Sequence, residues 1–450
     1  MAGASRTGRW AAAVAAGVVA VSFAAGPAAG GDWLQWRGPQ LNGSTDEADL
    51  PVKFTKTENL AWVVRMPGVS GATPVVIGKR IFLVSTTRES DDLLAMCLST
   101  TDGSTLWSKA LGKGSSGGRG EIAACSPASD GKTVWFLFGS GDLAATDLDG
   151  KVIWQRSLVK SYGCFAIKFG YSASPLLYKG RLYIPLLRRE KPYPYSPGAD
   201  LPFVPPLKSY LLCLDAGTGK EIWKQIRSTD AADESREVYI TPMPITAGGR
   251  TEIVIPGGEY ITGHDAETGK ELWRWEFTKE RNIWQRIVSS PLIGEGLIFQ
   301  SQARGQVLYA LRPGGKGRLG HGDYAWKFTG PASDVCTPLL YRGRLYVLAE
   351  DAKVMTCLEP KTGKVVWQEK IGGAGPYRAS PTGADGKIYC ISEGGDFVVL
   401  AAGDKFEELY RFSLGARPCR SSIVAARGAL YLRLSKHLAC VRKMPPPAAP

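Results

Sequence analysis

Residues 174–184 read Ser-Pro-Leu-Leu-Tyr-Lys-Gly-Arg-Leu-Tyr-Ile, and residues 213–223 read Cys-Leu-Asp-Ala-Gly-Thr-Gly-Lys-Glu-Ile-Trp. This unit has a Ser/Thr-Pro pair, an aliphatic run, a Gly-Arg turn, a short strand and an Asp-x-x-Thr-Gly-Lys-x-x-Trp motif. Related units return about every 40 to 50 residues, a period typical of solenoids and propellers. They lie at residues 73–107, 126–154, 241–273, 290–326, 337–367 and 380–410, of which 290–326 and 380–410 match least well.

Each unit has the composition of four short strands, with almost no helical periodicity. Gly180, Gly343 and Gly386 supply the positive φ of two-residue hairpins. The last unit runs out after its third strand, and residues 59–64, which carry Trp62 in the repeated tryptophan position, can supply the fourth. Inner strands begin at Pro74, Pro127, Pro175, Pro242, Pro291, Pro338 and Pro381, with an eighth, lacking proline, at Ser421.

These features predict an all-β fold: an eight-bladed β-propeller of four-stranded antiparallel blades. The ring is closed by an N-terminal strand that completes the last blade, which removes exposed sheet edges.

The first 30 residues have the layout of a cleaved secretory signal: Arg6, Arg9, an apolar run at residues 10–25 and small residues up to Gly30. The alternative is a lone membrane anchor, although the run is shorter than the ~20 residues that a span requires. We therefore predict a signal peptide at 1–30, a propeller at 31–443 and a proline-rich tail at 444–450. After cleavage we expect no membrane-spanning segment.

The chain has 450 residues and a formal net charge of +13, and residues 1–30 contribute only two of these positive charges. Outside the cytoplasm, a basic surface suits anionic polysaccharide or lipid headgroups, or serves solubility alone. No basic helix or arginine-aromatic signature indicates a nucleic-acid partner.

The chain contains nine cysteines. Cys97, Cys213, Cys357 and Cys440 share one third-strand position, and equivalent positions on different blades lie too far apart to form a disulfide. We expect buried thiols that pack as small hydrophobic groups. Whether the other five cysteines form any disulfide stays open.

The repeats resemble the pyrroloquinoline-quinone (PQQ) repeat propellers. This superfamily includes the eight-bladed quinoprotein alcohol dehydrogenases and the propeller lipoprotein of the outer-membrane β-barrel assembly machine. The resemblance covers residues 32–441. The opening Asp32-Trp33-Leu-Gln-Trp36-Arg37-Gly38-Pro39 looks like the N-terminal signature of exported quinone-repeat-like propellers. Such a resemblance implies the fold, whereas chemistry varies within a fold.

The resemblance to the dehydrogenases implies a pair of adjacent cysteines beside the quinone, and a calcium or lanthanide ion held by acidic and amide side chains. This chain has no adjacent cysteines, and His264, His321 and His437 are too scattered for a metal site. We predict no catalytic residues, no metal ligands and no cofactor, with PQQ plus calcium as the alternative. The lipoprotein resemblance implies an acylated cysteine after the signal, but the first cysteine here is Cys97.

Variable loops on a rigid scaffold are the usual place for binding. The longest insertion, residues 188–206, is expected to form an extended flap over the central funnel. Aromatic and arginine side chains just before the inner strands would suit an anionic sugar or an extended peptide. The alternative is that they pack the funnel mouth and pair with one another. The predicted ligand-binding residues of the funnel rim are Glu121, Tyr171, Tyr239, Trp284, Arg286, Asp334, Tyr377, Arg378, Arg417 and Arg420.

Taken together, these features predict a periplasmic or secreted, monomeric, non-catalytic propeller that serves as a binding or scaffolding platform in the cell envelope. Its partner would be an envelope protein or an anionic polysaccharide. One alternative function is a PQQ-dependent dehydrogenase with an atypical site, and another is an anionic-polysaccharide-binding module.

Overall fold

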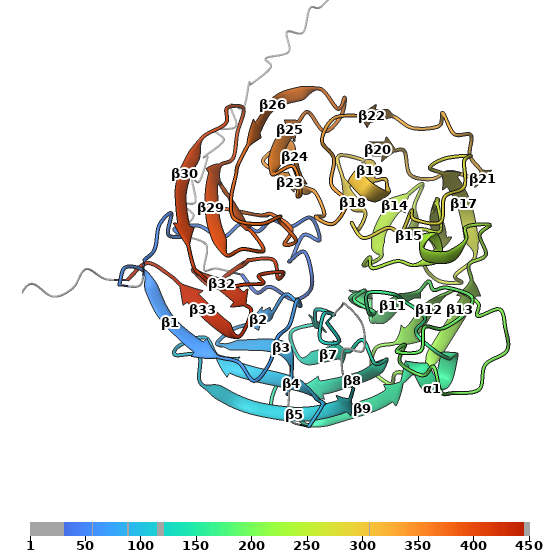
Figure 1. Cartoon of the computed structure of the whole chain (residues 1–450), viewed down its shortest axis with the longest axis horizontal. Helices are drawn as coiled ribbons and strands as arrows, with labels where there is room; N and C mark the ends of the chain where they lie inside the picture. The colour runs from blue at the N-terminus through green and yellow to red at the C-terminus, as the bar shows by residue number, and fades with distance from the viewer. Residues whose placement is uncertain (1–30, 56, 88–89, 115–120, 306, 445–450) are drawn as a thin grey trace, which may run out of the picture.

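The computed structural model describes residues 31–55, 57–87, 90–114, 121–305 and 307–444. Its eight sheets stand in a ring around a central axis (Figure 1). The predicted eight-bladed propeller is therefore confirmed. The predicted signal peptide, and all of the predicted tail except Met444, lie outside the described residues.

We number the blades along the chain. Their inner strands face the axis, and their outer strands carry the repeated tryptophans. Blade 1 contains β2 (Val75–Ile77), β3 (Arg80–Thr86), β4 (Asp92–Ser99) and β5 (Thr105–Lys113). Blade 2 contains β6 (Ala128–Ser129), β7 (Thr133–Leu137), β8 (Asp142–Asp147) and β9 (Val152–Ser157). Blade 3 contains β10 (Leu176–Tyr178), β11 (Arg181–Leu186), β12 (Tyr210–Asp215) and β13 (Glu221–Ile226). Blade 4 contains β14 (Met243–Ala247), β15 (Arg250–Gly257), β16 (Tyr260–Asp265) and β17 (Glu271–Glu276).

The remaining blades repeat this order. Blade 5 contains β18 (Leu292–Gly294), β19 (Leu297–Ser301), β20 (Leu308–Leu311) and β22 (Trp326–Phe328). Blade 6 contains β23 (Leu339–Tyr341), β24 (Arg344–Ala349), β25 (Val354–Leu358) and β26 (Val365–Lys370). Blade 7 contains β27 (Thr382–Ala384), β28 (Lys387–Ile391), β29 (Asp396–Ala401) and β30 (Glu408–Ser413). Blade 8 contains β31 (Val424–Ala426), β32 (Ala429–Leu434), β33 (His437–Val441) and β1 (Leu60–Arg65).

The ring is closed by the predicted N-terminal strand. β1 pairs antiparallel with β33, and Trp62 lies opposite Cys440. Figure 1 shows this blue strand beside the red C-terminal strands. Helical structure in the described residues is confined to α1 (Leu158–Tyr162), η1 (Asp233–Arg236) and η2 (Ala303–Gly305). None of the described helices is long and apolar enough to cross a membrane.

The repeated tryptophan joins the outer edges of neighbouring blades. The indole N–H of Trp107 in blade 1 donates to the carbonyl of Leu148 in blade 2 at 2.9 Å. A Cβ at Gly150 (φ +84°) would lie 2.8 Å from the same indole ring, so this turn requires glycine. Equivalent bonds to the next blade are made by Trp62, Trp154, Trp223, Trp326 and Trp367.

The Ser/Thr-Pro pair joins the inner edges. The hydroxyl of Ser126 accepts the backbone N–H of Thr73 from the preceding blade at 2.9 Å, and the hydroxyl of Ser174 accepts the N–H of Ser126 in the same way. The hydroxyls of Ser290, Thr337 and Ser380 repeat this bond at 2.9–3.0 Å. Between these two seams the core is built from facing blades: Phe82 and Cys97 of blade 1 pack in one buried cluster with Phe136 of blade 2.

Blade 4 departs from the repeat. The residues between β20 and β22 include β21 (Gly317–Arg318), which pairs in parallel with β17 and makes this sheet five-stranded. Trp273 is fully buried and donates to the buried carboxylate of Glu252 at 2.7 Å instead of to the next blade. Burial, with Arg227 nearby, lowers the pKa of His264 to about 4. Its Nε2 lies 2.9 Å from the hydroxyl of Thr262.

The N-terminal Trp-x-x-Trp-Arg-Gly segment, which we call the strap (residues 32–47), crosses the ring on the face of the hairpins between first and second strands, where Asp32 accepts the N–H of Gly78 and Glu47 accepts that of Arg427. The opposite face, which carries the loops between second and third strands, is the loop-rich face. Gln35 and Leu177 of blade 3 exchange two hydrogen bonds. The buried guanidinium of Arg37 donates to the carbonyls of Pro338 and Pro381 at 2.8 and 3.0 Å, which joins blades 6 and 7. A Cβ at Gly43 (φ +87°) would overlap this guanidinium, so the strap's turn requires glycine.

All nine cysteines are buried and free. The prediction that the third-strand cysteines are buried thiols is confirmed, and the other five are buried and unpaired as well. Burial raises the pKa of every one of these thiols.

We predict that Trp107→Phe lowers the free energy of unfolding by about 0.5–1.5 kcal/mol, because the ring stays but its bond to the next blade is lost. Urea denaturation of both proteins measures this difference. The matched control is Trp284→Phe, since Trp284 is half exposed and its indole N–H donates no hydrogen bond to the described residues. An equal loss of stability in both variants would show that the indole hydrogen bond between neighbouring blades does not stabilise the ring.

Candidate functional site

The inner strands surround a central cavity of about 470 Å³. Every blade contributes at least one serine or threonine to its wall, and Trp36 of the strap contributes an indole ring. Because the strap crosses this end of the ring, Trp36 forms the floor of the cavity, and the arginines and carboxylates of the rim loops form its upper wall. The serine and threonine residues of the wall are Thr73, Ser126, Ser172, Ser174, Thr241, Ser290, Thr337, Ser380 and Ser422.

Three arginines of the cavity wall are each held between two carboxylates. Arg420 donates to Glu393 at 2.7 Å and to Glu121 at 3.1 Å. The other two arginines repeat this arrangement with partners from neighbouring loops. Arg286 lies 3.4 Å from Glu234 and 3.6 Å from Asp334, and Arg378 lies 2.9 Å from Asp351 and 3.7 Å from Glu350.

Burial raises the pKa of three rim carboxyls, Glu121, Glu237 and Glu350. Desolvation outweighs the arginine beside Glu121, which acts in the opposite direction. One oxygen of Glu121, Oε2, is buried without a hydrogen-bond partner in the described residues. These three rim carboxyls therefore retain their protons more readily than exposed ones.

Glu350 also fixes the loop that leads into blade 6. Its carboxylate accepts the backbone N–H groups of Asp334 and Val335 at 3.0 and 2.8 Å, and the hydroxyl of Ser333 at 3.3 Å. Asp334 in turn pairs with Arg286 of the neighbouring blade. The buried carboxylate thus sets the position of one of the arginine partners.

One side of the cavity wall is aromatic. Phe169 and Tyr239 both line the cavity, with their ring centroids 6.3 Å apart. The guanidinium of Arg286 lies 5.4 Å from the Phe169 ring. The insertion at residues 188–206 is anchored beside this wall, where the Tyr193 hydroxyl donates to Glu237 at 2.9 Å. No side chain of this insertion lines the cavity, so the expected flap over the funnel is found at its margin instead.

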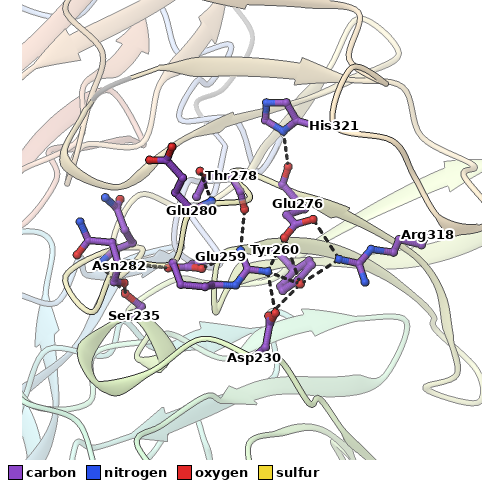
Figure 2. Close-up of polar contacts among 12 residues, drawn as sticks. Asp230, Ser235, Glu259, Tyr260, Glu276, Thr278, Glu280, Asn282, Arg318 and His321 are labelled. Carbon is purple, nitrogen blue, oxygen red and sulfur yellow. Dashed lines mark hydrogen bonds and ion pairs between the residues drawn. The ribbon is translucent and has the colours of Figure 1, made fainter.

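A second polar cluster stands behind the rim on blade 4 (Figure 2). The Tyr260 hydroxyl donates to Asp230 at 2.9 Å and accepts from Arg281 at 2.8 Å, and Arg318 pairs with Glu276 at 3.1 Å. The Arg281 guanidinium also pairs with Asp230 and Glu276.

This cluster also ties two rim loops together. The Ser235 hydroxyl donates to the carbonyl of Asn282, whose N–H donates to Glu259 at 3.1 Å (Figure 2). Ser235 follows Glu234 directly, and the Asn282 loop carries Arg286. The cluster therefore holds one arginine and its carboxylate partner in place.

The predicted rim residues divide into two groups. Five of them line the cavity: Glu121, Tyr239, Arg286, Arg378 and Arg420.

The other five do not line it. Tyr171 and Tyr377 are fully buried between blades, which corrects their expected place at the rim. Asp334 lies behind the wall and holds Arg286, while Trp284 is half exposed under the ammonium of Lys168. Arg417 lines two grooves at the edge of blade 7 instead.

Sequence reasoning missed several wall residues. Trp36 was visible only as part of an N-terminal signature, and nothing in its spacing placed it under the ring. Phe169 and Glu393 lie in loops that the repeat does not align. The Ser/Thr-Pro hydroxyls were visible as a repeat, and their one-per-blade spacing was the signal that could have placed them around the axis.

The described residues do not fit a bound quinone and metal of the dehydrogenase kind. No two cysteines are adjacent in the sequence, and all nine thiols are buried. No three histidine, cysteine, aspartate or glutamate side chains of the described ranges come together in a group that could hold a metal ion. Here the rim carboxylates hold arginines instead.

The ring and its cavity define a PQQ-repeat-like eight-bladed propeller. The family model PQQ_2, described as outer membrane protein assembly factor BamB, matches residues 3–182, 198–321 and 317–406. The chain belongs to this family.

Among solved structures, the fold is similar to the quinohemoprotein alcohol dehydrogenase of Comamonas testosteroni (TM-score 0.66, 14% identity, 93% of this chain and 82% of that one). It is also similar to BamB of Moraxella catarrhalis (TM-score 0.58, 12% identity, 84% and 98%). A europium-containing methanol dehydrogenase gives a TM-score of 0.63 at 13% identity, covering 89% of each chain.

One curated relative is the polyvinylalcohol dehydrogenase of Sphingopyxis sp. (strain 113P3), 26% identical over 206 residues. The alignment covers 44% of this chain and 28% of that protein, so the two share little more than a quarter of the relative's length.

We predict that Arg378→Met lowers the free energy of unfolding by about 1–3 kcal/mol near neutral pH, because it leaves the buried Glu350 without its cation. The variant should raise the pKa of the Glu350 carboxyl further above its unfolded value. A carboxyl pKa above its unfolded value means that the folded state binds more protons than the unfolded state. The free energy of unfolding therefore falls as the pH rises.

Urea unfolding at about pH 5 and about pH 8 measures this loss, which should be larger at the higher pH. The control is Lys370→Met, which removes an exposed charge that makes no ion pair with the described residues. A loss of stability that does not depend on pH would show that the charge of Arg378 does not affect the pKa of Glu350.

Proposed function

We propose that this protein is an exported, non-catalytic propeller that binds a partner on its loop-rich face and serves as a platform in the cell envelope. The observation that carries the proposal is the pairing of charged side chains in the cavity wall. Its arginines and most of its carboxylates are already paired with one another, which supports recognition of a partner rather than catalysis.

The family to which the chain belongs supports this role, since its description is that of an assembly factor. The N-terminal signal motif supports a place in the periplasm or outside the cell. The rim does not favour an anionic polysaccharide as the partner, because its ion pairs join six carboxylates to only three arginines and one lysine.

Site-specific photo-crosslinking in the native host tests the platform. A benzophenone amino acid replaces Val204, which is 86% exposed in the insertion between β11 and β12 on the loop-rich face. The matched control places it at Lys220, an exposed residue in the hairpin of the opposite face. We expect discrete adducts from position 204 and none from position 220. The same adducts from both positions would overturn the proposal.

The second candidate function is a PQQ-dependent dehydrogenase, which the polyvinylalcohol dehydrogenase relative favours. We predict that the mature protein, titrated with PQQ and calcium, shows no saturable quenching of its tryptophan fluorescence, because the wall lacks the groups to hold them. The control is the double variant Arg378→Met and Arg420→Met. Saturable quenching that this variant abolishes would establish the dehydrogenase and displace the platform.

A further inference from the structure

The floor and lower wall of the cavity hold hydrogen-bond donors that the protein does not use. The hydroxyls of Ser126, Ser174, Ser290, Thr337 and Ser380 each accept one backbone N–H across a blade junction. Their O–H protons have no acceptor among the described residues, and the indole N–H of Trp36 has none either. A ring of donors therefore surrounds the lower cavity.

The upper wall has the opposite character. Each of its arginines is fixed between two carboxylates, and these carboxylates outnumber the cations that they hold. An anionic ligand would meet this excess of negative charge, and a strongly cationic one would have to displace an arginine. A neutral ligand that both donates and accepts hydrogen bonds disturbs neither arrangement.

Aromatic rings complete the wall. Trp36 at the floor and Phe169 and Tyr239 at the side line the same cavity as the paired charges. Flat apolar faces beside fixed polar groups suit a ring that carries hydroxyls on its edge and C–H groups on its face. The cavity volume of about 470 Å³ lies within the range of about 300–1,000 Å³ for small-molecule sites.

We propose that the cavity binds the end of a neutral saccharide chain. Because the strap runs from blade 3 to blades 6 and 7 and Trp36 lines the cavity there, the terminal sugars enter from the loop-rich face. The lower hydroxyls and the Trp36 indole donate to the sugar oxygens, and the rim carboxylates accept from the sugar hydroxyls. This inference rests on the proposed binding role and names its ligand.

Isothermal titration of the mature protein with maltotriose, cellotriose and chitotriose tests the inference. We expect at least one of these neutral trisaccharides to bind, with an affinity that does not change between low and high salt. Trp36→Phe, which keeps the ring and removes the indole donor, and Glu393→Gln should each weaken binding about tenfold or more. Trp284→Phe, on the same face but outside the cavity, should leave binding unchanged.

Trigalacturonate and trilysine serve as the charged probes. Tighter binding of either one would overturn the inference, and so would the absence of binding by all three neutral sugars. Binding that survives both Trp36→Phe and Glu393→Gln would place the sugar elsewhere. Adducts from position 204 that persist without saccharide binding would overturn this inference alone and leave the platform standing.

Discussion

The structure depends on the hydrogen bonds that join one blade to the next. At the outer edge an indole N–H reaches the turn of the following blade, and at the inner edge a serine or threonine hydroxyl accepts a backbone N–H from the preceding blade. These bonds fix both edges of a junction whose interior is apolar and therefore not directional. The same motif that marks the repeat in the sequence thus supplies the seams of the ring.

The inner seam has a consequence for the cavity. A hydroxyl that accepts a backbone N–H keeps its own proton, so each of the five inner junctions with this bond also leaves one unused donor on a residue that lines the cavity. The strap adds the floor, because Arg37 binds carbonyls of blades 6 and 7 while Gln35 binds blade 3. Closure of the ring and construction of the cavity are therefore parts of one arrangement.

The side chains of the rim, rather than the fold, determine what this propeller can bind. The chain shares its fold with quinohemoprotein alcohol dehydrogenases and with BamB, at 12–14% identity. At this identity the likeness concerns the backbone alone, and the side chains of the wall decide what the cavity can hold. In this chain the carboxylates of the wall hold arginines, with Arg420 between Glu121 and Glu393 as the closest example.

The sequence by itself determined the eight blades and the closure by residues 59–64, because strand and turn signals are local and return with a fixed period. It did not determine which rim residues face the cavity. Neighbours along an extended chain point in opposite directions, so Tyr377 is buried between blades while Arg378 lines the cavity. Nor could it pair the charges, since Glu121 and Arg420 are 299 residues apart and meet only because the ring closes.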